Sequence, residues 1–214
     1  MAAQGDSGVS CRVTAVEIEA ALAAAGLSSL PPEGGAQLAA YVALLLKWNS
    51  RLNLTAVREP AEIVRRHLVE CVQCAQVLPE VDTLLDFGSG AGLPGVPIAV
   101  VRPEIRVTLG ESQGKKAAFL REIVRTLGLN AEVFDQRIEK MPSERVFDAV
   151  TLRAVDKMAE ATREAVHRVR AGGWLVIFAT VGTEGRLKPA VVEWERRVGI
   201  SGLNEGMLLL GRKQ

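Results

Sequence analysis

Hydrophobic residues recur every three or four positions through residues 13–80, the spacing typical of amphipathic helices. Thr14 and Glu17 are placed as a capping box for the first helix, and Gly26 follows its end. Residues 1–12 are small and polar, and we expect them to form a disordered tail. The pattern therefore predicts a helical N-terminal segment with helices at residues 14–25, 33–49 and 60–78.

The hydrophobic pattern changes at Val81. From there, short runs rich in valine, isoleucine and leucine alternate with amphipathic stretches, as in βαβ units built on a parallel sheet. Residues 81–214 therefore predict a doubly wound, Rossmann-like α/β domain, to which the helical segment is an N-terminal extension. The expected strands are residues 83–87, 106–110, 131–135, 147–152, 174–179 and 206–210, and the expected helices are residues 95–101, 115–127, 157–170 and 184–198.

The composition favours a cytoplasmic globular protein. The chain has 214 residues, of which 48% are hydrophobic, enough for one large domain with a helical extension. Cys71 and Cys74 form a CxxC pair without a second cysteine or histidine pair, so we expect packed thiols and no metal site. The N-terminus has no signal-peptide pattern, and no apolar run approaches the ~20 residues that span a bilayer.

The most informative segment is LLDFGSGAGLPGVPIAV, residues 84–100. In it, a predicted buried strand runs into Gly88, Gly90 and Gly92, and a helix follows with Pro94 near its start. Glycines allow unusual backbone angles and the close approach of a ligand, while the helix N-terminus offers unpaired N–H groups. Such a loop at the carboxyl end of the first strand predicts a nucleotide-binding site.

Two acidic residues bear on which nucleotide binds there. Gly90, Gly92 and Gly95 also fit the GxGxxG pattern of NAD-binding proteins, which is a weak signal alone. Asp86 precedes the loop, where its charge would repel a pyrophosphate but would suit the ammonium group of S-adenosylmethionine. Glu111, at the end of the second strand, is placed to accept both ribose hydroxyls of an adenosine. Glu111 thus indicates an adenosine, and Asp86 favours S-adenosylmethionine over NAD.

Five segments of the chain carry a family resemblance. They are KWNSRLNLTAVREP (47–60), RRHLVE (65–70), LLDFGSGAGLPGVPIAVVRPE (84–104), ESQGKKAAFLREIV (111–124) and FDAVTLRAV (147–155). In this order they resemble the GidB (RsmG) family of small-subunit ribosomal RNA guanine-N7 methyltransferases. The resemblance implies a class I methyltransferase fold, S-adenosylmethionine as methyl donor, and a guanine of the small-subunit ribosomal RNA as acceptor.

The resemblance also implies roles for individual residues. Gly88 and Leu93 match the family's cofactor loop, and Glu111 matches the acid that binds the ribose. The pair Ile138–Glu139 matches the segment beside the adenine, and Arg153 matches an arginine at the mouth of the site. The chain departs from the family where a Lys-Gly pair commonly follows the fifth strand, because it reads Ala179–Thr180–Val181–Gly182 there.

N7 of guanine carries a lone pair on a neutral ring, so its methylation needs positioning rather than a general base. We expect no obligatory catalytic acid or base, and Arg153 and His67 are positioning candidates. The alternative for Arg153 is a structural ion pair. A base in folded RNA must be splayed out, which calls for a basic rim around the site. The RNA-binding candidates are Arg51, Arg58, Arg65, Arg66, Lys115, Lys116, Arg121 and Arg125.

The expected partner is the small-subunit ribosomal RNA or the small ribosomal subunit, and the expected state is a monomer. Three alternatives stay open on the residues alone. They are an NAD-dependent oxidoreductase, a methyltransferase for a small molecule or a protein, and an inactive α/β domain that binds RNA.

Overall fold

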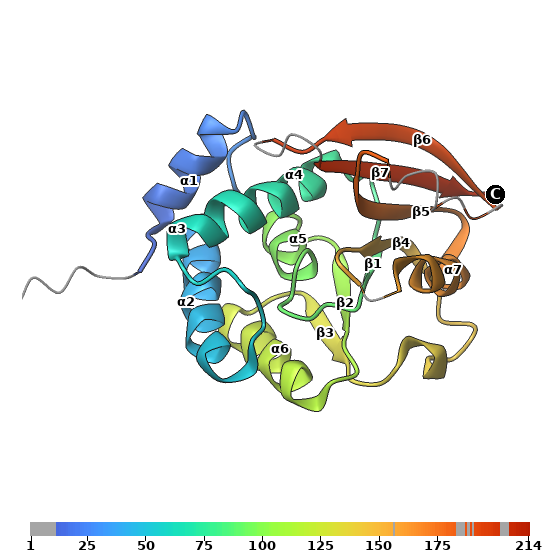
Figure 1. Ribbon diagram of the computed structural model, residues 1–214, viewed down its shortest axis with the longest axis horizontal. Coiled ribbons are helices and arrows are strands. Elements are labelled where there is room, and N and C mark those ends of the chain that lie inside the picture. The colour runs from blue at the N-terminus through green and yellow to red at the C-terminus, as the bar shows by residue number, and fades with distance from the viewer. Residues whose placement is uncertain (1–11, 156, 183–186, 188, 190, 202–205) are drawn as a thin grey trace, which may run out of the picture.

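A seven-stranded sheet runs through the middle of the computed structural model, which describes residues 12–155, 157–182, 187, 189, 191–201 and 206–214 (Figure 1). The strand order is β3-β2-β1-β4-β5-β7-β6. The first five strands are parallel, whereas β7 is antiparallel to both β5 and β6. The strands are β1 (Thr83–Phe87), β2 (Arg106–Gly110), β3 (Ala131–Phe134), β4 (Phe147–Leu152), β5 (Val169–Thr180), β6 (Val192–Gly199) and β7 (Gly206–Lys213).

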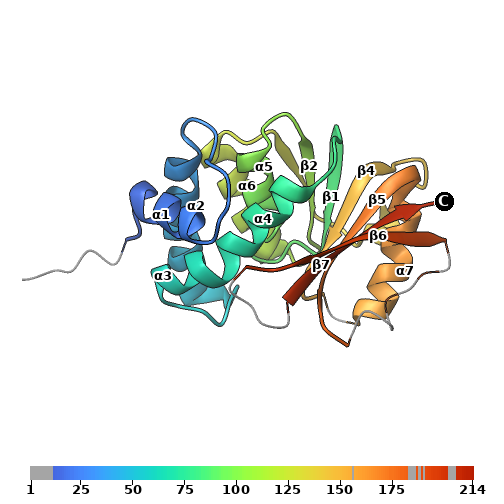
Figure 2. The same ribbon diagram turned by 90° about the horizontal axis from the view of Figure 1, so that it is seen from above.

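Helices cover both faces of the sheet, as a doubly wound fold requires, but unequally (Figure 2). Among the α-helices in the described part of the chain, α7 (Met158–Arg168) alone packs on one face. The other face carries α5 (Gly95–Val101) and α6 (Gly114–Leu127), with the N-terminal helices packed over them. Those helices are α1 (Ala15–Ala24), α2 (Gly34–Leu52), α3 (Pro60–Ile63) and α4 (Val69–Val77).

The N-terminal helices share one hydrophobic core with the sheet. Leu45 of α2, Phe119 of α6 and Leu84 of β1 are fully buried members of the same cluster. Trp48 joins α2 to α6, because its ring centroid lies 5.8 Å from that of Phe119 and its Nε1 donates to Glu122 over 3.1 Å. The helical extension is therefore packed against the α/β part. The division into a tail at 1–12, a cap at 13–80 and a domain at 81–214 stays a prediction, and the tail lies almost wholly outside the described residues.

The expected helix at residues 184–198 is wrong over the part that the structure describes. Val192–Gly199 is strand β6, which pairs with β7 along the edge of the sheet. Gly211 of β7 makes the pairing possible, because a Cβ there would lie 2.4 Å from Val192 and 2.7 Å from the Trp194 ring. The spacing of charged and apolar residues in this segment resembles that of a helix. The segment forms a strand because it pairs with β7, and the periodicity of the sequence does not reveal that partner.

The expected helix at residues 60–78 is interrupted by a π-helical turn, Val64–Leu68, between α3 and α4. Such turns are rare and often lie at functional sites. Cys71 and Cys74 follow it and are fully buried free thiols, and burial raises the pKa of both, as expected for packed residues. Across the part of the chain that the structure describes, no helix is long and apolar enough to cross a membrane.

Helix α5 approaches β1 and β2 unusually closely at Gly95. A Cβ at this position would lie 2.4 Å from Leu109 Cδ2 and 2.7 Å from Asp86 Oδ2. Both neighbours are buried, so neither has room to move aside. The close approach of the helix to the sheet therefore depends on glycine.

We expect Gly95→Ala to lower the free energy of unfolding by about 1–3 kcal/mol, because overpacking a buried contact forces neighbouring atoms apart. Urea unfolding monitored by circular dichroism measures the change. Gly114→Ala is the matched control, since a Cβ at Gly114 meets nothing within 4 Å. The control should stay within about 0.5 kcal/mol of the parent. Equal stabilities for the two variants would contradict this account of the packing.

Candidate functional site

The glycine loop leaves β1 at the point where the strand order reverses between β1 and β4. Gly88, Gly90 and Gly92 have φ angles of 74°, 52° and 89°, in the left-handed region that favours glycine. Tyr41 of α2 anchors the loop, because its hydroxyl donates a hydrogen bond to the Ala91 carbonyl over 2.7 Å. The predicted loop is thus present, and it is fixed in part by a residue of the N-terminal helices.

Asp86 lies beneath this loop and is almost fully buried. Its Oδ2 accepts from the Gly95 N–H at the start of α5 over 3.1 Å, and its Oδ1 accepts from the Thr151 hydroxyl of β4 over 3.0 Å. Burial raises the pKa of Asp86 to about 6, while these hydrogen bonds favour the ionised form. Both oxygens are therefore bonded within the protein, which the sequence did not indicate.

Glu111 follows β2 and connects two loops. Its Oε2 accepts from the Gly90 N–H over 3.1 Å, and its Oε1 accepts from the Gln113 N–H over 2.7 Å. The residue is 7% exposed. Each carboxylate oxygen can accept more than one hydrogen bond, so Glu111 keeps acceptor capacity for a ligand.

A cavity of about 480 Å³ opens at the carboxyl ends of β1, β2 and β3. Four of the residues predicted to bind cofactor line it: Gly88, Glu111, Ile138 and Glu139. Ile138 reaches it from a short 3₁₀ turn, and it fits there because Gly110 has no side chain. We call this space the first cavity. Asp86, Gly90, Gly92, Leu93 and Arg153, which were also predicted to contact cofactor, are not among the residues that line it.

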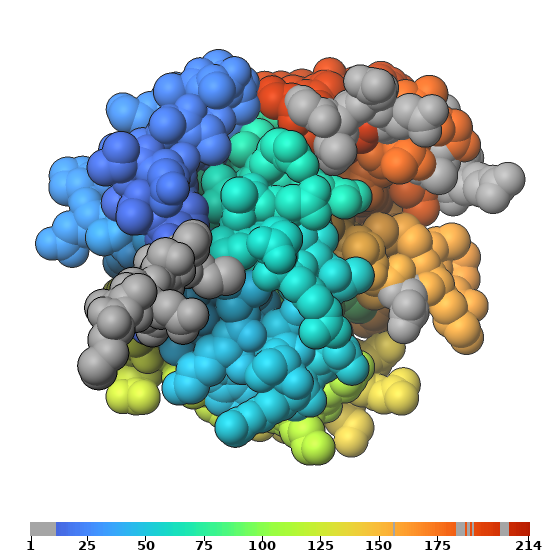
Figure 3. All heavy atoms as spheres, turned by 60° about the vertical axis from the view of Figure 1, so that its left-hand side comes forward, coloured from blue at the N-terminus to red at the C-terminus, as the bar shows by residue number. Residues whose placement is uncertain are grey.

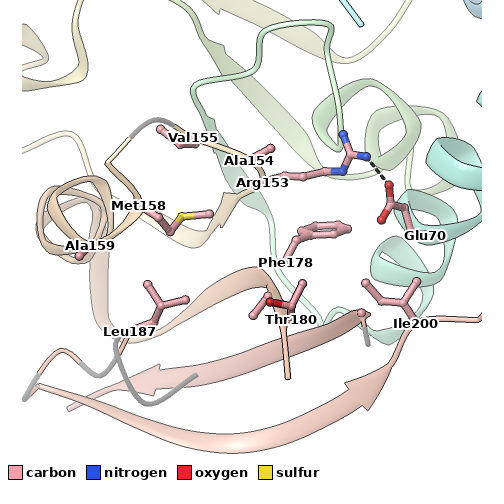
Figure 4. Close-up of a pocket in the computed structure, with 12 residues that line it drawn as sticks. Glu70, Arg153, Ala154, Val155, Met158, Ala159, Phe178, Thr180, Leu187 and Ile200 are labelled. Atoms are coloured by element: carbon pink, nitrogen blue, oxygen red, sulfur yellow. Dashed lines mark hydrogen bonds and ion pairs between the residues drawn. The ribbon is translucent and has the colours of Figure 1, made fainter. Parts of the chain in front are cut away.

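A second cavity, of about 580 Å³, opens at the carboxyl ends of β4 and β5 (Figure 4). Arg153 and Glu70 lie at one end of it, and the ring of Phe178 forms part of its wall. Val155 lines both cavities, so the two spaces lie on either side of this residue. Apolar side chains make up most of the remaining wall, namely Met158, Leu187 and Ile200.

Arg153 is held by an ion pair with the buried carboxylate of Glu70. Its Nη2 also lies 2.9 Å from His67 Nδ1, and its guanidinium carbon lies 5.9 Å from the Phe178 ring centroid. Arg153 therefore does form a structural ion pair, which was the alternative interpretation of this residue. The ion pair does not remove Arg153 from the site, because the same side chain lines the second cavity.

His67 extends this network into the N-terminal segment. His67 Nδ1 lies 2.9 Å from Arg153 Nη2 and 3.5 Å from Glu70 Oε1. Nε2 lies 3.2 Å from the Thr55 hydroxyl, and the backbone of Thr55 bonds in both directions with the Asn49 amide. The network therefore joins the LNLT segment to the wall of the second cavity.

Sequence reasoning missed Glu70, Thr55 and Phe178 as site residues. Glu70 and Thr55 lie within the segments RRHLVE and LNLT that carried the family resemblance. The available signal was a glutamate within an apolar helical pattern, since a buried charge needs a partner. Phe178 gave no such signal, because an aromatic residue in a strand is ordinarily part of the core.

The predicted RNA-binding residues lie on the surface outside both cavities. Arg51 is exposed in the last turn of α2. The segment between α2 and α4, which forms the middle of the face in Figure 3, carries three more exposed arginines, Arg58, Arg65 and Arg66. Arg65 pairs with Glu62 and Arg121 pairs with Asp135. None of the eight lines a cavity described above. The α6 members are Lys115, Lys116, Arg121 and Arg125, of which Lys116 is half-buried and the others are exposed.

Comparison with solved structures identifies the fold. The chain superimposes on a SAM-dependent methyltransferase from Aquifex aeolicus with a TM-score of 0.58 and 18% identity, covering 72% of this chain and 93% of that one. It also superimposes on P. horikoshii TYW2 in complex with MeSAdo, with a TM-score of 0.57 and 18% identity over 68% and 62% of the two chains. The fold is that of class I methyltransferases.

Comparison of sequences identifies the family. The chain is 40% identical over 186 residues to ribosomal RNA small subunit methyltransferase G of Stenotrophomonas maltophilia, covering 86% of this chain and 85% of the relative. It is 44% identical over 154 residues to the protein of that name from Xanthomonas euvesicatoria, covering 72% of each. The family model GidB, described as rRNA small subunit methyltransferase G, matches residues 35–187. The chain therefore belongs to the GidB family of small-subunit ribosomal RNA methyltransferases.

Proposed function

We propose that the protein transfers the methyl group of S-adenosylmethionine to N7 of a guanine in small-subunit ribosomal RNA. The observation that carries this proposal is the pair of neighbouring cavities that are both lined by Val155. One has an acidic residue at the end of β2, suited to a ribose, and the other is apolar and suited to a base. A methyl donor and its acceptor must come into contact, and two cavities that share Val155 would hold them on neighbouring sides of that residue.

The residues of the first cavity fit the cofactor. Glu111 would accept the ribose hydroxyls, and Ile138 with Glu139 would flank the adenine. Gly88 has a positive φ, and a Cβ there would lie 3.2 Å from Val155, so glycine lets the loop pass close to Val155 at the wall of the first cavity. The loop would keep its shape through Gly90, Gly92 and Leu93, which do not line the first cavity.

Asp86 supports S-adenosylmethionine over NAD for a reason that differs from the sequence argument. In dinucleotide-binding folds, the pyrophosphate sits at the N-terminus of the helix after the glycine loop. Here the Asp86 carboxylate already accepts the Gly95 N–H at that helix start. A pyrophosphate would have to displace a buried acceptor and approach its negative charge. We propose that Asp86 holds the loop and favours the methionine ammonium by its charge, without direct contact.

The chain's own residues would catalyse transfer by position. N7 attacks with its lone pair and no proton moves, so neither His67 nor a carboxylate has to act as a base. The bound cofactor supplies the electrophilic methyl group. Arg153, held by Glu70 and His67, would orient the acceptor in the second cavity, and exclusion of water by the apolar wall would strengthen its electrostatic effect.

The surface residues Arg51, Arg58, Arg65, Arg66, Lys115, Lys116, Arg121 and Arg125 are our candidates for the basic rim that contacts RNA phosphates. We further propose that the substrate is the ribosomal RNA within the small subunit, and that the protein acts as a monomer in the cytoplasm.

S-Adenosylmethionine should bind with measurable heat in isothermal titration calorimetry, whereas NAD should give none at the same concentrations. The reason is that Asp86 occupies the helix start that a pyrophosphate needs. S-Adenosylhomocysteine is the positive control, because it shares the adenosine and methionine parts. Comparable heats from NAD would refute the assignment of the first cavity.

Glu111→Gln should raise the dissociation constant for S-adenosylmethionine by about tenfold, because hydrogen bonds to a charged acceptor are worth about 1.5–3 kcal/mol and to a neutral one about 1 kcal/mol. Titration calorimetry measures the change. Glu80→Gln, an exposed residue before β1, is the matched control and should bind as the parent does. A folded Glu111→Gln protein with the parent's affinity would show that Glu111 does not hold the ribose.

Arg153→Lys should lower kcat/KM on small subunits by about tenfold or more, since lysine keeps the charge but cannot reach Glu70 and His67 together. The dissociation constant for S-adenosylmethionine should stay within about threefold, a shift of roughly 0.6 kcal/mol. Stability should also fall, by about 1.5–3 kcal/mol in urea unfolding, because a buried charge-assisted bond is lost. Weakened cofactor binding with normal turnover at saturating cofactor would place Arg153 at the first cavity instead.

A further inference from the structure

We infer that Glu70 recognises the acceptor base: its second carboxylate oxygen accepts hydrogen bonds from the N1–H and 2-amino group of guanine, while the Phe178 ring stacks on the base. This inference rests on the proposed function, since it assumes that a guanine enters the second cavity. It names the residue that selects guanine and the edge of the base that this residue contacts.

Glu70 has half of its carboxylate available for a ligand. Its Oε1 pairs with Arg153, whereas Oε2 receives no hydrogen bond from any of the described residues. Figure 4 shows this oxygen pointing away from Arg153, toward the space between Phe178 and Ile200. The residue is 6% exposed as a whole and lines the second cavity. The free oxygen is open to the second cavity, where the N–H groups of a ligand can replace water as its hydrogen-bond donors.

The chemistry of a carboxylate selects guanine among the bases. An ionised carboxylate accepts hydrogen bonds and donates none. The Watson–Crick edge of guanine presents two adjacent donors, N1–H and the 2-amino group, whereas adenine presents the N1 lone pair at the same place. Guanine therefore satisfies the free oxygen of Glu70, and adenine places an acceptor against it. N7 lies on the opposite side of the purine, free for methylation.

The surroundings of Glu70 suit a base that has left its helix. Phe178 is half-buried at the carboxyl end of β5 and offers a ring for stacking. Val155, Met158 and Ile200 provide apolar walls. Arg153 fixes the carboxylate from one side, so the direction of its free oxygen is set before the base arrives.

The hydrogen bonds to Glu70 would also strengthen during the reaction. As the bond between N7 and the methyl carbon forms, the bond from that carbon to sulfur breaks, and the sulfonium becomes a neutral thioether. The positive charge passes to the purine ring, which makes N1–H and the 2-amino group better donors. A carboxylate that accepts from them stabilises the transition state more than the ground state.

A double-mutant cycle tests the inference. Parent and Glu70→Gln proteins are assayed on small subunits reconstituted with ribosomal RNA that carries either guanosine or inosine at the target position. Inosine keeps N7 and N1–H but lacks the 2-amino group. For the parent, we expect inosine to lower kcat/KM by about tenfold, the loss of one hydrogen bond to a charged group. For Glu70→Gln, the two substrates should differ by less than about threefold.

Two further measurements separate the possible failures. Titration with S-adenosylmethionine and a melting curve show whether Glu70→Gln is folded, and Glu80→Gln serves as the matched control. Equal inosine effects in the parent and in Glu70→Gln would overturn the inference and leave Glu70 as a positioning partner of Arg153. Equal rates of the parent on guanosine and inosine would overturn it even if the variant does not fold. Methyl groups found by mass spectrometry at an atom other than N7 would instead refute the proposed function.

Discussion

The buried carboxylate of Asp86 is the interaction on which the site's geometry depends. It joins the end of β1 to the first N–H of α5 and to Thr151 of β4, so three elements meet at one side chain. A carboxylate at this depth needs hydrogen bonds on both oxygens, and only this relative placement of strand, helix and neighbouring strand supplies them. The glycine loop is consequently held in one shape, with Gly88 and Glu111 facing a common space.

The second organising interaction joins the N-terminal helices to the sheet. Arg153 follows β4, and its partners Glu70 and His67 come from the segment around the π-helical turn. The turn places His67 and Glu70 on the same side of the helix, three residues apart, so one guanidinium can reach both. The helical extension is therefore part of the wall of the second cavity, in addition to covering the sheet. Tyr41 gives it a further link, to the glycine loop.

The two cavities differ in the side chains that line them, and each lining suits a different part of the reaction. The first is lined by backbone groups and by charged side chains of both signs, while the second is mainly apolar with one paired arginine and one glutamate. A polar nucleoside and a stackable base require different surroundings, and the change of strand order between β1 and β4 places the two side by side. Val155 lies at the boundary and contacts both spaces.

The sequence by itself determined the order of elements, the glycine loop and the family. Five parallel strands are read correctly because buried strands of such sheets are continuous apolar runs between helices. Gly88 and Glu111 were predicted as cofactor residues because each follows a strand, and the carboxyl ends of parallel strands meet at one edge. Ile138 and Glu139 were predicted because they match a segment of the family, and all four residues line the first cavity. The strand β6 was missed because its residues form a strand only in the presence of β7, a contact between distant parts of the chain.

Only the tertiary structure decided which groups face one another. Sequence placed Asp86 next to a ligand, but burial and two internal hydrogen bonds turn it toward α5 and β4. Sequence placed Arg153 at the mouth of the site, but not in the second cavity beside Glu70, which lies 83 residues earlier. Local patterns report which side chains are apolar or charged. They do not report the pairing of charges across the core, because that pairing is set by how the helices pack on the sheet.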